Sequence, residues 1–87
     1  MPSADLSQRL LDLTAEQLSV SPAQLQPDAL LGDELGVDSL AAIEWGMRIE
    51  DTFGISLPED SWHYIRTYGM VDELVTRLVR RSAAAQA

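Results

Sequence analysis

Ser39 is the residue of this 87-residue chain whose setting best suits chemistry, because it follows an aspartate within Gly36–Leu40, which reads Gly-Val-Asp-Ser-Leu. A serine hydrolase needs a histidine base within reach of the serine and a third group that orients the base. The chain has one histidine, His63, and the Gly-x-Ser-x-Gly motif is missing. We interpret His63 as a surface or half-buried residue, so hydrolysis is the least favoured use of Ser39.

Metal and phosphate chemistry have little support elsewhere in the chain. Cysteine is absent, which excludes a thiolate metal site, a cysteine nucleophile and a disulfide. The acids from Asp28 to Asp38 lack the alternating spacing and central glycine of a calcium loop, and no glycine-rich phosphate loop is present. We therefore expect no metal site, and we interpret the scattered aromatic residues as packing residues.

Acidic residues dominate the charge of the chain. The formal net charge is −8, from 14 acids and six bases, and all the bases are arginine. We expect no nucleic-acid partner, because a phosphate backbone requires a basic face. Nine acids lie between positions 28 and 60, where Arg48 is the only base. This region is either a solvated surface or a docking surface for basic partners, and charge alone favours the solvated surface.

The start of the chain does not resemble a signal peptide. Met1–Asp5 lacks the basic region and apolar run of a signal peptide. No apolar stretch approaches the roughly 20 residues that a membrane-spanning helix needs. We therefore expect a cytoplasmic protein without a membrane partner. The length suits one domain, 1–87, whose ends at 1–4 and 82–87 are predicted to be frayed.

The apolar pattern predicts an all-α fold with three main helices, one short helix and a long first loop. The first helix is expected over 5–18, where leucines recur at helical spacing, and Ser3 or Asp5 is its predicted cap. Pro22 is expected to open a short turn. Residues 23–37 form a long connection whose four leucines predict that it packs against the core.

The later helices are predicted from their end signals. The second helix is expected from Asp38 or Ser39 to position 53, with Asp38 as its N-cap and Gly54 as the left-handed residue after its end. A short helix is expected over 59–64. Thr67 is expected to cap the last helix.

The second helix carries two apolar stripes. At about 100° per residue from Ser39, one stripe spans about 240° to 340° and suits the core. It consists of Ala42, Trp45, Gly46, Ile49 and Phe53. The other spans about 40° to 100° and consists of Leu40, Ile43 and Met47. It is bordered by Glu50 on one side and by Glu44 and Asp51 on the other. Either the short helix covers this second stripe or the stripe is offered to a partner, and the pattern favours neither.

The segment around Ser39 resembles the Leu-Gly-x-Asp-Ser-Leu signature of acyl carrier proteins, because Leu35–Leu40 reads Leu-Gly-Val-Asp-Ser-Leu. Further segments resemble the same family in order and spacing. They are the turn at Val20–Leu25, the helix end at Phe53–Pro58 and the entry to the last helix at Ile65–Tyr68. Glu44 stands where the family usually has a glutamate. The resemblance covers nearly the whole chain.

The resemblance implies a four-helix carrier bundle in which Ser39, flanked by Asp38 and Leu40, receives 4′-phosphopantetheine from coenzyme A. It implies that the chain is not an enzyme but holds an acyl or aminoacyl thioester for other enzymes. The implied partners are a phosphopantetheinyl transferase, a loading enzyme, and an acyltransferase or ketosynthase. The carrier itself is expected to be a monomer. The implied docking residues are Leu40, Ile43, Glu44, Met47, Arg48 and Asp51.

Three residues depart from the family pattern of fatty acid synthesis. Ala41 replaces a frequent acid, Gly46 replaces an aliphatic core residue, and Arg48 places a cation on the acidic helix. They favour a discrete carrier of a specialised pathway, polyketide-like as in antibiotic biosynthesis or aminoacyl-carrying, over a carrier for fatty acid synthesis. Carriers for fatty acid synthesis or for aminoacyl and peptidyl groups stay as alternatives. Peptidyl carriers usually show Gly-Gly-x-Ser-Leu. A different class, an unmodified helical adaptor that uses the same acidic stripe, stays open.

Gly46 and Arg48 each allow a specific interpretation. Gly46 makes room for Trp45 or Trp62, or lets two helices approach, or it widens a cleft for cargo, since carriers of this family can shelter an acyl chain between their helices. Packing is the favoured interpretation of Gly46. Arg48 is interpreted as a repulsive element toward some basic partners.

Overall fold

The computed structural model describes residues 2–86, with side chains for residues 5–84. These residues form four α-helices and a 3₁₀ turn: α1 (Pro2–Leu18), η1 (Pro22–Gln24), α2 (Ser39–Phe53), α3 (Ser61–Tyr64) and α4 (Tyr68–Gln86). Over this range there is no strand, and an isolated antiparallel bridge pairs Leu30 with Thr67. The predicted all-α fold, with three main helices, one short helix and a long first loop, is confirmed.

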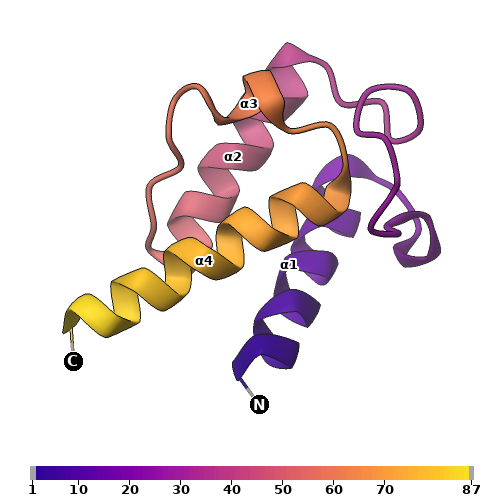
Figure 1. The fold of residues 1–87 in the computed structure, drawn as a ribbon. Coiled ribbons are helices and arrows are strands. Elements are labelled where there is room, and N and C mark those ends of the chain that lie inside the picture. Colours follow the sequence, from indigo (N-terminus) through magenta and orange to yellow (C-terminus); the bar gives the residue numbers. More distant parts are fainter. Residues whose placement is uncertain (1, 87) are drawn as a thin grey trace.

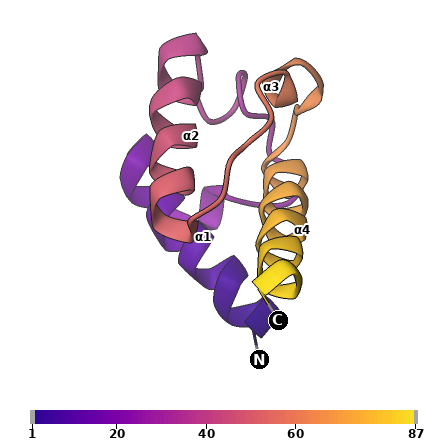
Figure 2. The same ribbon diagram turned by 90° about the vertical axis from the view of Figure 1, so that its left-hand side faces the viewer.

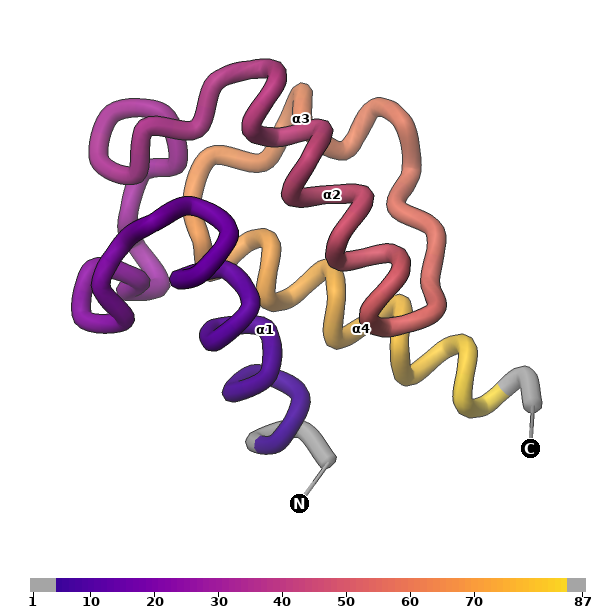
Figure 3. Tube along the Cα trace, turned by 180° about the vertical axis from the view of Figure 1, so that it is seen from behind, coloured from indigo at the N-terminus to yellow at the C-terminus, as the bar shows by residue number. Residues whose placement is uncertain are grey.

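The three long helices surround the core, and the short helix lies near one end of it. Helix α1 packs against both α2 and α4 (Figure 1). The view turned by 90° shows α2 on one side and α4 on the other, with α1 running obliquely from α2 toward the lower end of α4 (Figure 2). Helix α3 lies on the side of α4, at the same end of the molecule as the start of α2 (Figure 2). The first loop lies beside the segment that leads into α4 (Figure 3). This arrangement brings the first loop, the start of α2 and α3 to the same end of the molecule.

Three of the helix ends that were predicted from capping residues are confirmed. The Asp38 carboxylate accepts a hydrogen bond from the Ala41 amide at 2.8 Å, just before α2 begins. Gly54 adopts the left-handed conformation, with φ +65°, where α2 ends. The Thr67 hydroxyl accepts a hydrogen bond from the Met70 amide at 3.3 Å, just before α4 begins. These short-range bonds satisfy amides that have no partner inside the helix.

Three other helix ends differ from the prediction. Helix α1 begins at Pro2, so Ser3 and Asp5 lie inside its first turns and neither is its cap. Proline suits this position because its missing N–H would have no helical partner there. Helix α3 begins at Ser61, two residues later than expected. Helix α4 continues to Gln86, where a frayed tail was predicted. Its last turns are rich in alanine, which is the best helix former. The first and last residues of the chain lie outside the described part.

The first loop is fastened to the segment that precedes α4. The Leu31 amide donates to the Arg66 carbonyl at 2.9 Å, and the Gly69 amide donates to the Pro27 carbonyl at 2.9 Å. A Cβ atom at Gly69 would lie 2.7 Å from that carbonyl oxygen, so the close approach requires glycine. The buried leucines of the loop are Leu25, Leu31 and Leu35. The prediction that the loop packs against the core is therefore confirmed.

Trp45 of α2 lies at the centre of the core and is 0% exposed. Its indole N–H donates to the hydroxyl of Thr14, a buried residue of α1, at 3.0 Å. Tyr68, also buried, extends the core to α4. Burial raises the pKa of the Tyr68 phenol well above its usual range, Asp72 adds to the rise, and the Thr14 hydroxyl partly offsets it.

Candidate functional site

Ser39 is the first residue of α2, and its side chain is exposed. The backbone before it is held in place, because Gly36 is left-handed with φ +70° and the Val37 amide donates to the Leu31 carbonyl at 2.8 Å. The Asp38 cap then starts the helix. The free amides and the positive end of the dipole of this 15-residue helix therefore lie beside the serine. The Ser39 hydroxyl is thus accessible to an enzyme and close to a favourable place for a phosphate.

The second apolar stripe of α2 is exposed. Leu40 is 64% exposed, Ile43 56% and Met47 60%. Glu44 and Asp51 are exposed at the border of these three residues. We call the five residues together the exposed α2 face. The hypothesis that the short helix covers this stripe is therefore wrong, and the stripe is available to a partner.

Arg48 is turned away from the exposed α2 face and toward α1. Its guanidinium forms an ion pair with Glu16 and donates to the Gln17 side-chain oxygen at 3.3 Å. The structure thus separates Arg48 from the other predicted docking residues and uses it to join two helices. Sequence reasoning missed this pair because Glu16 lies 32 positions earlier in the chain.

An open groove of about 500 Å³ begins at Ser39. The end of the first loop, α2 and the α3 region all contribute to its lining. Apolar lining comes from Val37, Trp62 and Ile65, and Arg66 adds a cation. The sequence predicted the serine but not this groove, because its lining residues come from three separate segments.

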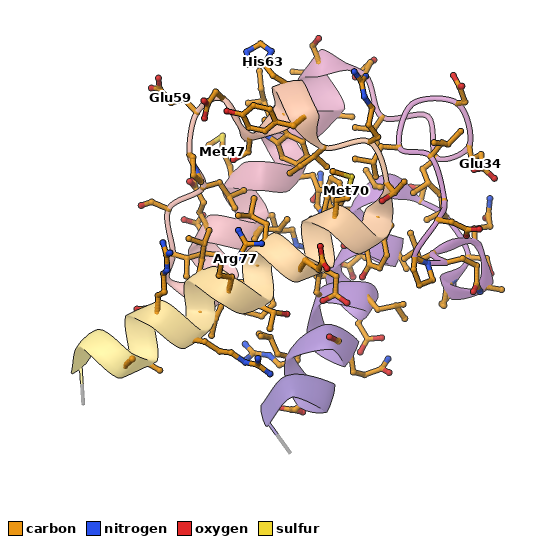
Figure 4. The ribbon with its side chains drawn as sticks, viewed as in Figure 1. Glu34, Met47, Glu59, His63, Met70 and Arg77 are labelled. Carbon is orange, nitrogen blue, oxygen red and sulfur yellow. The ribbon has the colours of Figure 1, made fainter. Side chains whose placement is uncertain are left out.

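The structure supports no other chemistry near the serine. His63 is exposed and points outward from α3 (Figure 4), and no hydrogen bond of the described residues joins it to Ser39. Among residues 2–86 no group of three or more histidine and acidic side chains could hold a metal ion. Within the described residues, His63 is therefore not placed as a base for the Ser39 hydroxyl.

Known proteins match most of this chain. Residues 8–64 match the family model described as the phosphopantetheine attachment site. A protein of Amoebophilus asiaticus (strain 5a2) named acyl carrier protein is 34% identical over 74 residues, which cover 85% of this chain and 92% of that protein. The chain belongs to the acyl carrier protein family. The predicted family is thus confirmed.

Membership of the acyl carrier protein family gives the chain its prosthetic group, covalently bound 4′-phosphopantetheine. Acyl carrier proteins are carriers rather than catalysts, and they work with a phosphopantetheinyl transferase and with acyl-processing enzymes. In addition, no helix within residues 2–86 is both long enough and apolar enough to span a lipid bilayer.

The residues around Ser39 fit this prosthetic group. The serine is exposed, so its hydroxyl can be modified without unfolding the chain. The phosphodiester of the arm would lie near the amides at the start of α2, which favour an anion. The groove beside the serine offers both apolar and polar lining to the rest of the arm.

The structure also shows which tryptophan uses the room that Gly46 leaves. A Cβ atom at Gly46 would lie 3.3 Å from Cζ2 of Trp62 and 3.5 Å from Cδ1 of Leu57. The ring centroids of Trp62 and Trp45 are 5.6 Å apart, with the planes tilted by 39°. Gly46 therefore makes room for the ring of Trp62, in agreement with the favoured interpretation.

Proposed function

We propose that Ser39 is the attachment point of the 4′-phosphopantetheine arm and that the chain carries an acyl or aminoacyl group for a specialised, polyketide-like pathway. The observation that carries this proposal is the position of Ser39, exposed at the start of α2 between the Asp38 cap and the exposed α2 face. When bound, the arm supplies the thiol that holds the cargo as a thioester.

The residues around Ser39 prepare its hydroxyl for modification. When the transferase attaches the arm, the Ser39 hydroxyl oxygen bonds to the phosphorus that carries the pantetheine in coenzyme A. The hydroxyl proton passes to a base of the transferase, and the adenosine bisphosphate part of coenzyme A leaves. Asp38 holds the serine at the helix start by capping α2. Leu40, the next residue, offers an exposed apolar contact to the enzyme that approaches Ser39.

The exposed α2 face is the proposed docking surface for the transferase, the loading enzyme and the acyltransferase or ketosynthase. Leu40, Ile43 and Met47 form its apolar centre, and the flexible methionine suits contact with several partners. Glu44 and Asp51 give it an acidic border that attracts basic partner surfaces. Arg48, which is paired with α1, lies only at its edge.

The specialised pathway is proposed from the residues that depart from the pattern of fatty acid synthesis. Ala41, which is half-buried, stands where an acid is frequent, and Gly46 accommodates Trp62. A carrier for fatty acid synthesis is the second candidate, because the relative from Amoebophilus asiaticus has the general name acyl carrier protein. Loading rates with acyl-transferring enzymes of the two kinds of pathway, measured on the same phosphopantetheinylated protein, decide between them.

Intact mass tests the attachment site. The unmodified protein is incubated with coenzyme A and a broad-specificity phosphopantetheinyl transferase, and we expect the mass of one phosphopantetheine to be gained. Ser39→Ala should remain helical by circular dichroism and gain nothing. Ser56→Ala, which alters another exposed serine, should gain the group like the wild type. Modification that persists in Ser39→Ala contradicts the assignment, and a folded wild type that gains nothing favours the unmodified adaptor.

A further inference from the structure

Trp62 of α3 contacts two regions that matter for a carrier. On one side its ring lines the groove that begins at Ser39. On the other side it lies against Gly46 and Trp45 on the buried face of α2. A prosthetic arm and its acyl group that start at Ser39 and enter the interior between α2 and α3 therefore meet this indole.

The interior behind Trp62 is closely packed. Trp45 is 0% exposed and is anchored by its hydrogen bond to Thr14, so the ring that supports Trp62 is held in place. Cδ1 of Leu57 approaches the Gly46 position from the segment between α2 and α3. That segment is itself fixed, because the Leu57 amide donates to the Glu50 carboxylate at 2.7 Å. The space that a glycine leaves on α2 is thus already filled with side chains.

We propose that Trp62 closes the interior of this carrier to its cargo, so that an acyl chain attached through Ser39 lies in the open groove and not between the helices. The proposal rests on the proposed function of Ser39 and adds a class of cargo to it. Because each methylene that stays near water forgoes its burial, a long alkyl chain gains little from this carrier. The cargo class is therefore a short acyl group.

The groove itself agrees with a short cargo. Val37 and Ile65 supply apolar lining, but Asp33 and Arg66 line the same groove, which is open to solvent. Such a surface can contact the first atoms of a chain or a polar substituent. It does not enclose a long hydrocarbon in the way that a buried apolar cavity does.

Melting temperatures of loaded forms test the proposal. Acetyl, octanoyl and dodecanoyl groups are loaded on the phosphopantetheinylated wild type and on Trp62→Ala, and the melting temperature of each form is measured. For the wild type we expect no rise with chain length. For Trp62→Ala we expect the melting temperature to rise with chain length, because the chain fills the space of the lost indole. A rise of more than about 4 °C in the wild type, or no rise in either protein, overturns the proposal.

A control, a replacement variant and a second readout complete the test. Tyr64→Ala also removes an aromatic ring from α3, but Tyr64 is 61% exposed, so its variant should behave like the wild type. If Trp62→Ala does not fold, Trp62→Leu replaces it. The indole N–H resonance of Trp45 should keep its chemical shift in every loaded wild-type form, and a shift that grows with chain length contradicts the proposal.

A different attachment separates this proposal from the function of Ser39. The chain has no cysteine, so Ser39→Cys introduces a single thiol to which the same alkyl chains can be joined through a linker of pantetheine length. If the transferase leaves Ser39 unmodified, the proposed function fails. The melting temperatures of the alkylated Ser39→Cys protein still show whether the interior admits a chain.

Discussion

The two faces of α2 carry similar residues but differ in what covers them. On one face Trp45 and Ile49 are 0% exposed, beneath side chains from the other helices and from the first loop. On the other face Ile43 is 56% exposed and Met47 60%. Two isoleucines six positions apart on one helix thus occupy opposite environments.

This difference separates the stability of the carrier from its function. The buried face holds the three long helices together, so its side chains contribute to the free energy of unfolding. The exposed face gives up that contribution, and its apolar side chains are useful only when a partner covers them. Changes on the two faces should therefore affect different measurements.

The largest effect is expected from truncating the buried face. Trp45→Ala removes the ring that contacts Trp62 and Thr14, and it should lower the free energy of unfolding by about 3–5 kcal/mol. Met47→Ala, on the exposed face, should change it by less than about 0.5 kcal/mol. Urea unfolding followed by circular dichroism measures both. Similar losses in the two variants would remove the distinction between the faces.

A smaller loss is expected from adding volume to the buried face. Gly46→Val places its Cβ 3.3 Å from Trp62 and should cost about 1–3 kcal/mol by overpacking, despite the better helix propensity of valine. Gly32→Ala is the control, because nothing lies within 4 Å of its Cβ position. If thermal melts show that Gly46→Val leaves the unloaded protein as stable as the wild type, an open cleft replaces the packing interpretation.

On the exposed face the expected effect concerns partner enzymes. Met47→Asp puts a charge at the centre of the proposed docking surface and should lower kcat/KM of the transferase about tenfold, equivalent to about 1.4 kcal/mol. Glu44→Lys, at the border, should act mainly on the association rate, with a stronger effect at low salt. Both variants should unfold at the wild-type urea concentration. Wild-type turnover in both, with every partner, would place docking elsewhere.

The smallest effect is a loss of stability at alkaline pH, which again distinguishes buried from exposed residues. The folded state raises the pKa of Tyr68 above the unfolded value, so above about pH 10 the unfolded chain releases a proton that the folded chain keeps. Stability is therefore complete below about pH 10 and falls as pH rises further. The chain has no lysine and no cysteine, so its two tyrosines dominate this range.

Tyrosine variants assign this effect. Tyr68→Phe should flatten the fall in unfolding free energy between about pH 9 and about pH 11. The exposed Tyr64 also has a raised pKa, because its hydroxyl donates to the Asp60 carboxylate, but solvent weakens this contribution. Tyr64→Phe is thus the matched control and should leave most of the fall in place. If Tyr68→Phe and the wild type lose stability equally, burial of Tyr68 is not the cause.

Much of the site could be predicted from residues close together in the chain. Asp38 and Gly54 set the ends of α2, and Ser39 follows its cap, because capping bonds join groups within four positions of each other. The spacing of apolar residues likewise separated the two stripes, since the turn of the helix assigns each position to a face. The sequence by itself therefore determined which residue is the attachment candidate and which residues could surround it.

The tertiary structure decided what each of these residues meets. The pairing of Arg48 with Glu16, the approach of Gly69 to Pro27 and the filling of the Gly46 space by Trp62 all join segments that are distant in the chain. From the sequence, either Trp45 or Trp62 could use the space at Gly46, and the glycine could serve packing or widen a cleft. The sequence also did not decide whether the short helix or a partner covers the second stripe. Such contacts depend on how whole helices and loops pack, because many side chains must fit the same volume at once. Local periodicity carries no information about that fit.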